Sequence, residues 1–153
     1  MRIWTGAAFA LMVASSLGAQ TPESSDFSTA MPIAGSWSYA PAPDGGEAVF
    51  ANASGSPQLW VHCTRSTRRV TISKPDISAA PFVNVWTSSL TRSVASTYNS
   101  TTGRLTIDLA NFDPLLDALV SSHGRIAFSV AQRPPLVVPP WAEVARVVED
   151  CRV

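Results

Sequence analysis

The segment PQLWVHCTRSTRRVTIS, residues 57–73, decides the fold class of this chain. In LWVHC, residues 59–63, leucine, valine and cysteine fall on one face of a strand, and tryptophan and histidine fall on the other. A second alternating stretch, residues 69–73, comes after a short turn rich in arginine. The whole segment therefore predicts a β-hairpin with an apolar inner face.

The same period of two recurs along most of the chain, and turns rich in proline, glycine or asparagine separate its repeats. We expect further strands at residues 37–39, 47–51, 105–109 and 126–130, weaker ones at 81–86 and 90–95, and an edge strand at 136–138. This pattern predicts a mainly β domain, an antiparallel β-sandwich or a β-barrel-like sheet.

Two segments change to the helical period. Asp113 is an N-cap residue and proline occupies the first helical position after it, which predicts a short helix near 113–120. The last segment predicts a helix near 141–151. Its apolar positions fall on one face: Trp141, Val144, Val148 and Cys151. This helix turns its cysteine toward the apolar layer that holds Cys63.

The first segment predicts where the protein folds. Residues 1–19 begin with one positive charge at Arg2, continue through a short apolar run and end in small residues, which is typical of a secretory signal peptide. The alternative is a transmembrane anchor, but the strongly apolar part is shorter than the roughly 20 residues that a span needs. We therefore expect a periplasmic or secreted protein with no membrane span after cleavage.

Length and composition limit the class of protein to which the chain can belong. A chain of 153 residues with 46% hydrophobic residues suits one globular domain and is too apolar for a disordered chain. Its 11 basic and 11 acidic side chains balance, so no net field attracts nucleic acid. Residues 20–34, rich in Ser, Thr and Pro, predict a flexible lead-in, and residues 35–153 a single β-rich domain without a cofactor.

After removal of the leader the chain holds two cysteines, Cys63 and Cys151. Because thiols oxidise in exported proteins, we predict a disulfide between them. It closes a loop of about 88 residues, which contributes roughly 4–5 kcal/mol in the chain-entropy model. The alternative is a reactive or metal-binding thiol beside His62. Adjacent side chains of a strand point to opposite faces, so these two do not share a ligand set, and the disulfide is favoured.

The hairpin also carries the candidate ligand surface, whose residues are Trp60, His62, Arg65, Arg68 and Arg69. The three arginines are too few for phosphate-driven binding of nucleic acid. They are explained either as a polar hairpin turn or as a site for an anionic envelope ligand. The tryptophans that remain after the leader are explained by packing or by a surface that stacks on sugars. They are Trp37, Trp60, Trp86 and Trp141.

The sequence contains no convincing catalytic or metal-binding motif. Ser121, Ser122 and His123 supply hydroxyls and a base, but no G-x-S-x-G elbow and no third group accompany them. Asp113 and Asp117 are four residues apart, yet a helix cap and a solvated residue explain them better than acid–base catalysis. The two histidines lack the spacing of a zinc site. We therefore predict neither catalytic residues nor a metal.

The tail LVVPPWAEVARVVEDCR, residues 136–152, is distinctive. Together with DPLLDAL at residues 113–119 and SHGR at residues 122–125, it resembles a family of small exported proteins of alphaproteobacteria. The resemblance covers roughly residues 57–152. The order of an early Trp, a Cys at a strand end, a hairpin and a helix with a late Cys is more loosely similar to the invasion-associated locus B type. The resemblance implies an exported compartment and a β fold, and it offers no catalytic residue to carry over.

These observations favour an exported, non-catalytic β domain that binds an envelope component or a protein partner. A small periplasmic hydrolase that uses His123 with a nearby Ser or Asp is the alternative from a different class. An inhibitor of a host or rival enzyme is a third hypothesis, which differs from the first in its partner.

Overall fold

The computed structural model describes residues 25–153, so the predicted signal peptide lies outside the described residues. Within them the chain forms nine strands and two helices. The strands are β1 (Gly35–Ala42), β2 (Gly45–Asn52), β3 (Pro57–Thr64), β4 (Arg69–Pro75), β5 (Phe82–Trp86), β6 (Thr91–Asn99), β7 (Arg104–Ala110), β8 (Ile126–Ser129) and β9 (Leu136–Val138). The helices are α1 (Pro114–Ser121) and α2 (Ala142–Asp150).

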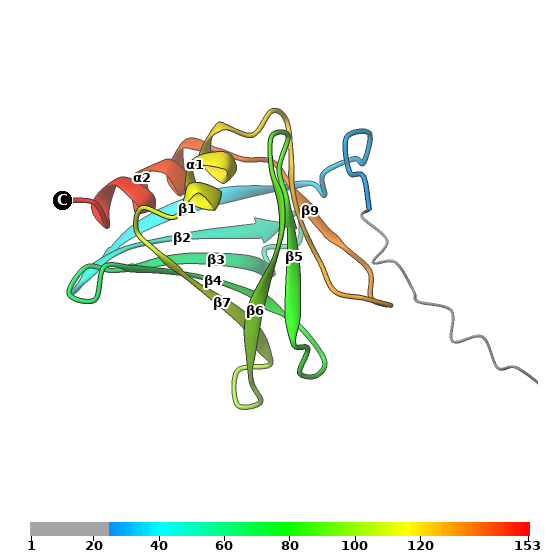
Figure 1. The fold of residues 1–153 in the computed structure, drawn as a ribbon, viewed down its shortest axis with the longest axis horizontal. Helices are drawn as coiled ribbons and strands as arrows, with labels where there is room; N and C mark the ends of the chain where they lie inside the picture. The colour runs from blue at the N-terminus through cyan, green and yellow to red at the C-terminus, as the bar shows by residue number, and fades with distance from the viewer. Residues whose placement is uncertain (1–24) are drawn as a thin grey trace, which may run out of the picture.

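The strands form one antiparallel sheet in the order β1-β2-β3-β4-β7-β6-β5-β8-β9, which curls into a half-barrel (Figure 1). The predicted hairpin is β3–β4, in which Cys63 lies opposite Val70. The next strand in the sheet is β7, which pairs with β4 along its whole length although about 30 residues separate them in sequence. The expectation of a mainly β domain with a barrel-like sheet is confirmed.

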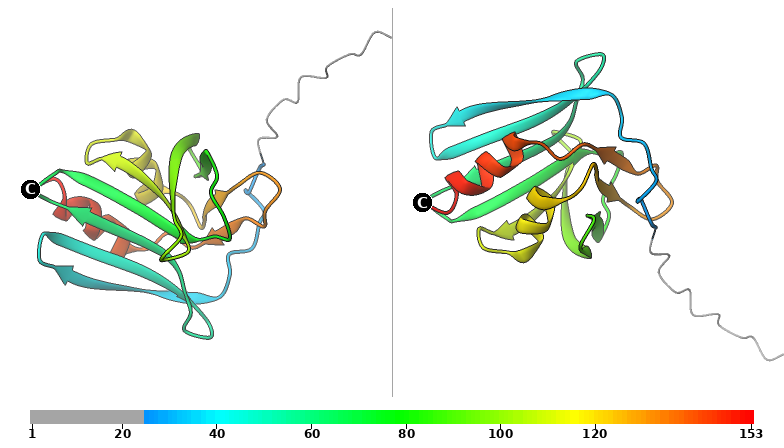
Figure 2. Two further views of the ribbon diagram at one scale, coloured as in Figure 1. Left: turned by 90° about the horizontal axis from the view of Figure 1, so that it is seen from below. Right: turned by 90° about the horizontal axis from the view of Figure 1, so that it is seen from above.

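Both helices lie on the concave side of the sheet (Figure 2). Helix α2 packs against β1, β2 and β3 and contacts α1. The apolar residues of each alternating strand face these helices and are buried, as the period of two predicts. The core includes Phe50, Leu59, Val61, Ile72, Leu105, Ile107, Leu116, Phe128 and Val148.

The helix boundaries agree with the sequence signals. Asp113 caps α1, because its Oδ1 accepts a hydrogen bond of 2.8 Å from the backbone N of Leu115. In α2 the predicted apolar face is buried at Val144, Val148 and Cys151. The prediction for Trp141 was wrong: it precedes the first turn in an extended conformation and its side chain is 54% exposed.

Residues 25–34, the described part of the predicted flexible lead-in, pack against the face of the sheet that turns away from the helices. Phe27 is buried in a small cluster with Trp86, Ala127 and Val137, and its ring packs edge-on with Trp86 at 6.2 Å between centroids. The backbone N of Ile33 donates to the carbonyl of Val137. This part of the segment is therefore bound to the domain rather than free of it.

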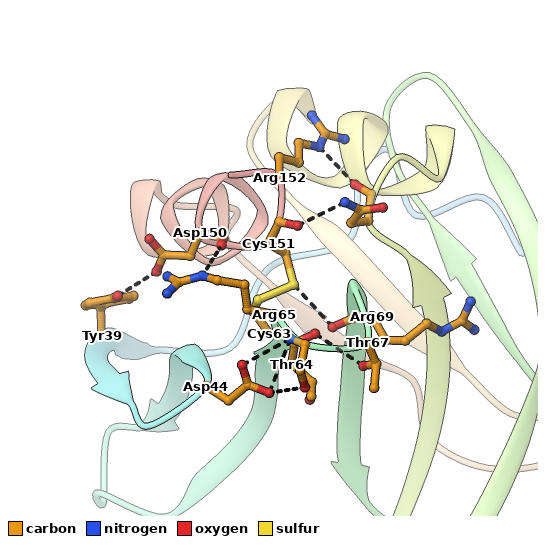
Figure 3. Close-up of a disulfide and its surroundings, with 12 residues drawn as sticks. Tyr39, Asp44, Cys63, Thr64, Arg65, Thr67, Arg69, Asp150, Cys151 and Arg152 are labelled. Carbon is orange, nitrogen blue, oxygen red and sulfur yellow. Dashed lines mark hydrogen bonds between the residues drawn. A yellow bond between two sulfur atoms is a disulfide. The ribbon is translucent and has the colours of Figure 1, made fainter.

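The predicted disulfide joins Cys63 on β3 to Cys151 at the end of α2, with 5.5 Å between the Cα atoms (Figure 3). Three hydrogen bonds hold the same helix end. Tyr39 Oη donates to Asp150 Oδ2 at 2.6 Å, Arg65 Nε donates to the carbonyl of Asp150 at 3.1 Å, and Asn111 Nδ2 donates to the carbonyl of Cys151 at 2.9 Å. Covalent and polar contacts together fasten α2 to the concave face.

Two glycines at the start of β2 permit this close approach. Gly45 has a φ of 140°, which favours glycine, and a Cβ on it would lie 2.3 Å from the carbonyl oxygen of Cys63. A Cβ on Gly46 would lie 2.5 Å from Asp150 Oδ2 and 2.7 Å from Tyr39 Oη. A larger residue at 45 would collide with the β3 backbone at Cys63, and one at 46 would push aside the side chains of Asp150 and Tyr39.

Candidate functional site

The structure divides the five residues of the predicted ligand surface. Trp60 and His62 lie half-buried on the outer face of β3, and Arg69 lies on the same face of β4, opposite Thr64. Arg65 and Arg68 lie in the turn between these strands. Arg65 turns its guanidinium to the carbonyl of Asp150 at the end of α2 (Figure 3). The three arginines therefore do not form a single basic patch.

The outer face of the sheet has two halves that differ in their cover. The outer sides of β5, β8 and β9 lie under residues 25–34, and we call them the covered half. The outer sides of β2, β3, β4 and β7 form the open half. Its side chains form two rows of directly opposed residues: Glu47, His62, Thr71 and Asp108 in one, and Val49, Trp60, Ser73 and Thr106 in the other.

The two carboxylates of the first row each lie beside a nitrogen-bearing side chain, His62 or Arg69. His62 Nδ1 lies 3.5 Å from Glu47 Oε2 across the β2–β3 pair. Arg69 Nε donates to Asp108 Oδ1 at 3.0 Å across the β4–β7 pair. Both pairs are partly exposed to solvent, so each adds little to stability.

The second row lies beside an arginine that no sequence pattern indicated. The guanidinium carbon of Arg104 lies 3.4 Å from the ring centroid of Trp60. Arg104 belongs to β7 and Trp60 to β3, so the arginine side chain reaches across β4. Beside them, the hydroxyls of Ser73 and Thr106 are 2.8 Å apart and share a hydrogen bond. An aromatic ring, a planar cation and two hydroxyls thus meet on one surface.

The predicted sugar-stacking set of four tryptophans does not share a face. Trp37 is buried in the core and its Nε1 donates to the carbonyl of Pro139 at 2.7 Å. Trp86 is covered by Phe27, and Trp141 lies exposed before α2. Of the four tryptophans, Trp60 alone stands on the open half.

The two helix carboxylates are engaged in structural contacts. Burial raises the pKa of Asp113, but hydrogen bonds from Arg92 and from the backbone N of Leu115 outweigh it and hold that pKa below its usual value. Asp117 accepts a hydrogen bond from Arg152 Nη1 at 2.9 Å. The pair serves as a cap and an ion-pair partner, as the alternative interpretation predicted for Asp113.

The hydroxyls next to His123 are also engaged. Ser121 Oγ donates to the carbonyl of Asp117, and Ser122 Oγ donates to the carbonyl of Arg125. His123 is exposed, and its backbone N donates to Ser88 Oγ. Within residues 25–153 no hydrogen bond joins the imidazole to either serine hydroxyl, so the geometry of an activated nucleophile is not formed there.

A buried ion cluster lies outside the sequence-predicted sites. Asp76, whose side chain is 5% exposed, contacts Lys74 Nζ and Arg133 Nη1, each at 2.6 Å. Burial raises the pKa of this carboxyl, but the hydrogen bond from Lys74, the backbone N–H of Ile77 and the two positive charges lower it below its usual value. The cluster ties the segment after β4 to the turn after β8.

Comparisons with known proteins found no match to a protein-family model, to a curated protein or to a solved structure. No helix in the described part of the chain is both long and apolar enough to cross a membrane. Between residues 25 and 153, no three His, Cys, Asp or Glu side chains gather in positions that would hold a metal ion.

Proposed function

We propose that this chain is an exported, non-catalytic β domain that binds a component of the cell envelope, or a protein partner, through the open half of its sheet. The observation that carries the proposal is the Trp60–Arg104 stack, which lies half-buried on a face that no other segment of residues 25–153 is seen to cover. A large aromatic residue and an arginine are the side chains most enriched at binding hot spots.

The way the sheet is stabilised supports this assignment. In β2, β3 and β4 the alternating apolar residues are buried on the concave side, where α2 packs against β2 and β3 and the disulfide joins it to β3. The opposite face carries polar and half-buried side chains that the core does not need. The side chains on that face are therefore available to contact a ligand without being required for the core.

Two observations support export. The leader at residues 1–19 has the charge and apolar pattern of a signal peptide. The disulfide is compatible with an oxidising location such as the periplasm or the extracellular medium. Mass spectrometry of the protein recovered from its native cells tests this: we expect a chain without residues 1–19 and without free thiols. A full-length, reduced chain in the cytosol would contradict export.

The non-catalytic part of the proposal is supported by the hydrogen bonds that the candidate catalytic side chains make. Among the described residues, the hydroxyls of Ser121 and Ser122 and the carboxylate of Asp113 each make contacts that hold α1 and its neighbours in place. A hydrolase would need at least one of these groups to turn toward His123. An activity against envelope substrates that His123→Ala abolishes would overturn the non-catalytic part of the proposal.

Binding by the open half is tested with isolated envelope fractions. The oxidised protein is mixed with the envelope material of its native cells and the bound fraction is measured by cosedimentation. We expect Trp60→Ala to reduce binding at least about tenfold, which is the effect of one hot-spot side chain. Trp141→Ala is the matched control, because that tryptophan is exposed outside the open half. Equal effects of the two substitutions would contradict the proposal.

A protein partner is tested by a photo-cross-linking residue in place of Thr71, which lies in the middle of the open half. The control places the same residue at Val120, which is 37% exposed and belongs to α1, a helix on the concave side of the sheet (Figure 2). We expect a discrete product from position 71 that Trp60→Ala removes, and none from position 120. A product from both positions would indicate non-specific contact and would count against the assignment of this face.

A further inference from the structure

We infer that Arg104, held on the ring of Trp60, is a binding residue for a carboxylate group, and that the ligand of the open half is an acidic saccharide of the uronic acid type. This inference rests on the proposed function and names the ligand chemistry of that face. Three features carry it: the state of the guanidinium, the groups beside it and the strands beneath it.

The guanidinium of Arg104 is positioned but its hydrogen-bond donors are unused. At 3.4 Å from the ring centroid, one of its faces is in contact with Trp60. Stacking engages the flat face of a guanidinium and leaves the N–H groups at its edge directed away from the ring. Within residues 25–153, Arg104 takes part in none of the hydrogen bonds or ion pairs to a carboxylate or carbonyl that other arginines make, such as Arg92 with Asp113 and Arg133 with Asp76.

Neither carboxylate of the open half pairs with Arg104. That face has two carboxylates, and each has another neighbour: Asp108 is paired with Arg69, and Glu47 faces His62. A planar fork of N–H donors fits a carboxylate in the two-bond arrangement that arginine favours. Among the described residues of this face, Arg104 is the arginine without a carboxylate partner, so its fork can take one carboxylate group of a ligand.

The neighbours of the stack fit a sugar. Ser73 lies directly opposite Trp60, and Thr106 is two residues from Arg104 on the same face of β7. Their hydroxyls are hydrogen-bonded to one another and keep capacity for further bonds. Neighbouring strands are about 4.8 Å apart, so these groups span a distance comparable to one sugar ring. The carboxylate would meet Arg104 while ring hydroxyls meet Ser73 and Thr106.

The strands beneath the site make an acidic peptide a poorer fit. Each of β2, β3, β4 and β7 has a paired strand on both sides, so their backbone groups are engaged within the sheet. An extended peptide gains much of its affinity by pairing its backbone with a free strand edge. The open half offers side chains alone, which suits a ligand that is recognised through its hydroxyl and carboxylate groups.

The test uses trigalacturonate as the probe and its fully methyl-esterified form as the neutral comparison. Binding to the full chain with its disulfide formed is measured by calorimetry and by tryptophan fluorescence at several salt concentrations. We expect the acid form to bind at least about tenfold more tightly than the ester, because the ester cannot accept charge-assisted bonds from Arg104. We also expect its affinity to fall as salt rises.

Substitutions then locate the site. Arg104→Gln is expected to reduce the affinity for trigalacturonate at least about tenfold, and Arg104→Lys to restore it in part, because lysine keeps the charge but lacks the fork. Arg68→Gln is the matched control: it removes the same charge from an exposed position in the β3–β4 turn. Thermal unfolding of each variant confirms that the fold is kept.

Four results would overturn the inference: equal binding of acid and ester, equal effects of Arg104→Gln and Arg68→Gln, binding of inorganic phosphate in place of the saccharide, or no saturable binding. If the saccharide test fails but Trp60→Ala still reduces binding to the envelope fraction at least about tenfold, the proposed function stands and the saccharide assignment alone fails. If neither substitution on the open half affects either ligand, both fail.

Discussion

Trp86 and Trp60 both stand on the outer face of the same sheet, but their rings are covered in different ways. Phe27, which belongs to the segment before β1, closes the surface over Trp86 and buries Ala127 and Val137 with it. Over Trp60 lies the guanidinium of Arg104. In the covered half an apolar side chain of the same molecule packs over the tryptophan. In the open half the tryptophan contacts a charged guanidinium whose N–H groups make no hydrogen bond to the described residues.

The difference shows where each half obtains its stability. In the open half, α2 and the disulfide hold the strands from the concave side. In the covered half, residues 25–34 add a second layer from outside. A region of sheet that is stabilised from its concave side can use its outer side to bind a ligand.

Four variants test this difference between the open half and the covered half, from the largest expected effect to the smallest.

Removal of the disulfide should have the largest effect and should act on the open half. For Cys63→Ala with Cys151→Ala we expect the free energy of unfolding to fall by about 4–5 kcal/mol, because the bond closes a loop of 88 residues. Urea unfolding measures the loss, and amide hydrogen exchange locates it. The exchange rate should rise more in α2 and β1–β3 than in β8 and β9. The reverse order would contradict this difference between the halves.

Phe27→Ala should destabilise the covered half. The ring is 8% exposed, so its removal leaves a gap over Trp86 and should cost about 3 kcal/mol in the free energy of unfolding. Phe82→Ala is the matched control, since that ring is 55% exposed and its loss should cost less than about 0.5 kcal/mol. If both substitutions cost the same small amount, residues 25–34 do not stabilise the domain.

Acid should weaken the link between the segment after β4 and the turn after β8. The pKa of Asp76 in the folded protein is lowered, so its ion cluster stabilises the fold above the unfolded pKa near 4 and loses this effect as the pH falls through the folded pKa. Asp76→Asn should cost about 2 kcal/mol at neutral pH. Unfolding measured from pH 6 to pH 2 should show a shallower decline in the variant.

A residual decline is expected in that variant, because the pKa of Asp113 is lowered as well. Its stabilising contact with Arg92 is present above the unfolded pKa and is lost in the same acidic range. Identical pH profiles of the wild-type protein and the Asp76→Asn variant would show that the buried cluster is not a source of acid sensitivity.

Trp60→Ala should have the smallest effect on stability. The ring and the guanidinium stacked on it are both half-buried and lie outside the core, so we expect a loss of about 1 kcal/mol or less in the free energy of unfolding. Trp86→Ala should cost more, because Phe27 loses its partner as well. If Trp60→Ala lowered the free energy of unfolding more than Trp86→Ala, the role of Trp60 would be to stabilise the fold and not to bind a ligand.

Local patterns predicted much of the fold because they act over a few residues. The alternation in β3 placed Cys63 inside and Trp60 outside, and the helical period turned Cys151 toward the same layer. The cap at Asp113 was readable for the same reason. The prediction that Trp141 is buried failed because this residue precedes the first turn of α2, and the helical period applies only to residues within the helix.

Apart from the disulfide, which the presence of just two cysteines after the leader predicted, contacts between distant segments were not readable from one sequence. The stack of Arg104 on Trp60 depends on the pairing of β7 with β4, which alternation does not specify. The packing of Phe27 against Trp86 joins residues about 60 positions apart in a segment without periodicity. The candidate site was therefore predicted in its β3 residues and missed in its β7 residue.

The glycine at position 46 has a consequence for how related sequences are to be recognised. Because a Cβ there would lie 2.5 Å from Asp150 Oδ2 and 2.7 Å from Tyr39 Oη, the residue at 46 and these two side chains depend on one another. A descendant that acquires alanine at 46 has to move one of these two side chains, which would disturb the hydrogen bond between Tyr39 and Asp150. We therefore expect glycine, tyrosine and aspartate at these three positions to change together in related sequences, alongside the two cysteines of the disulfide.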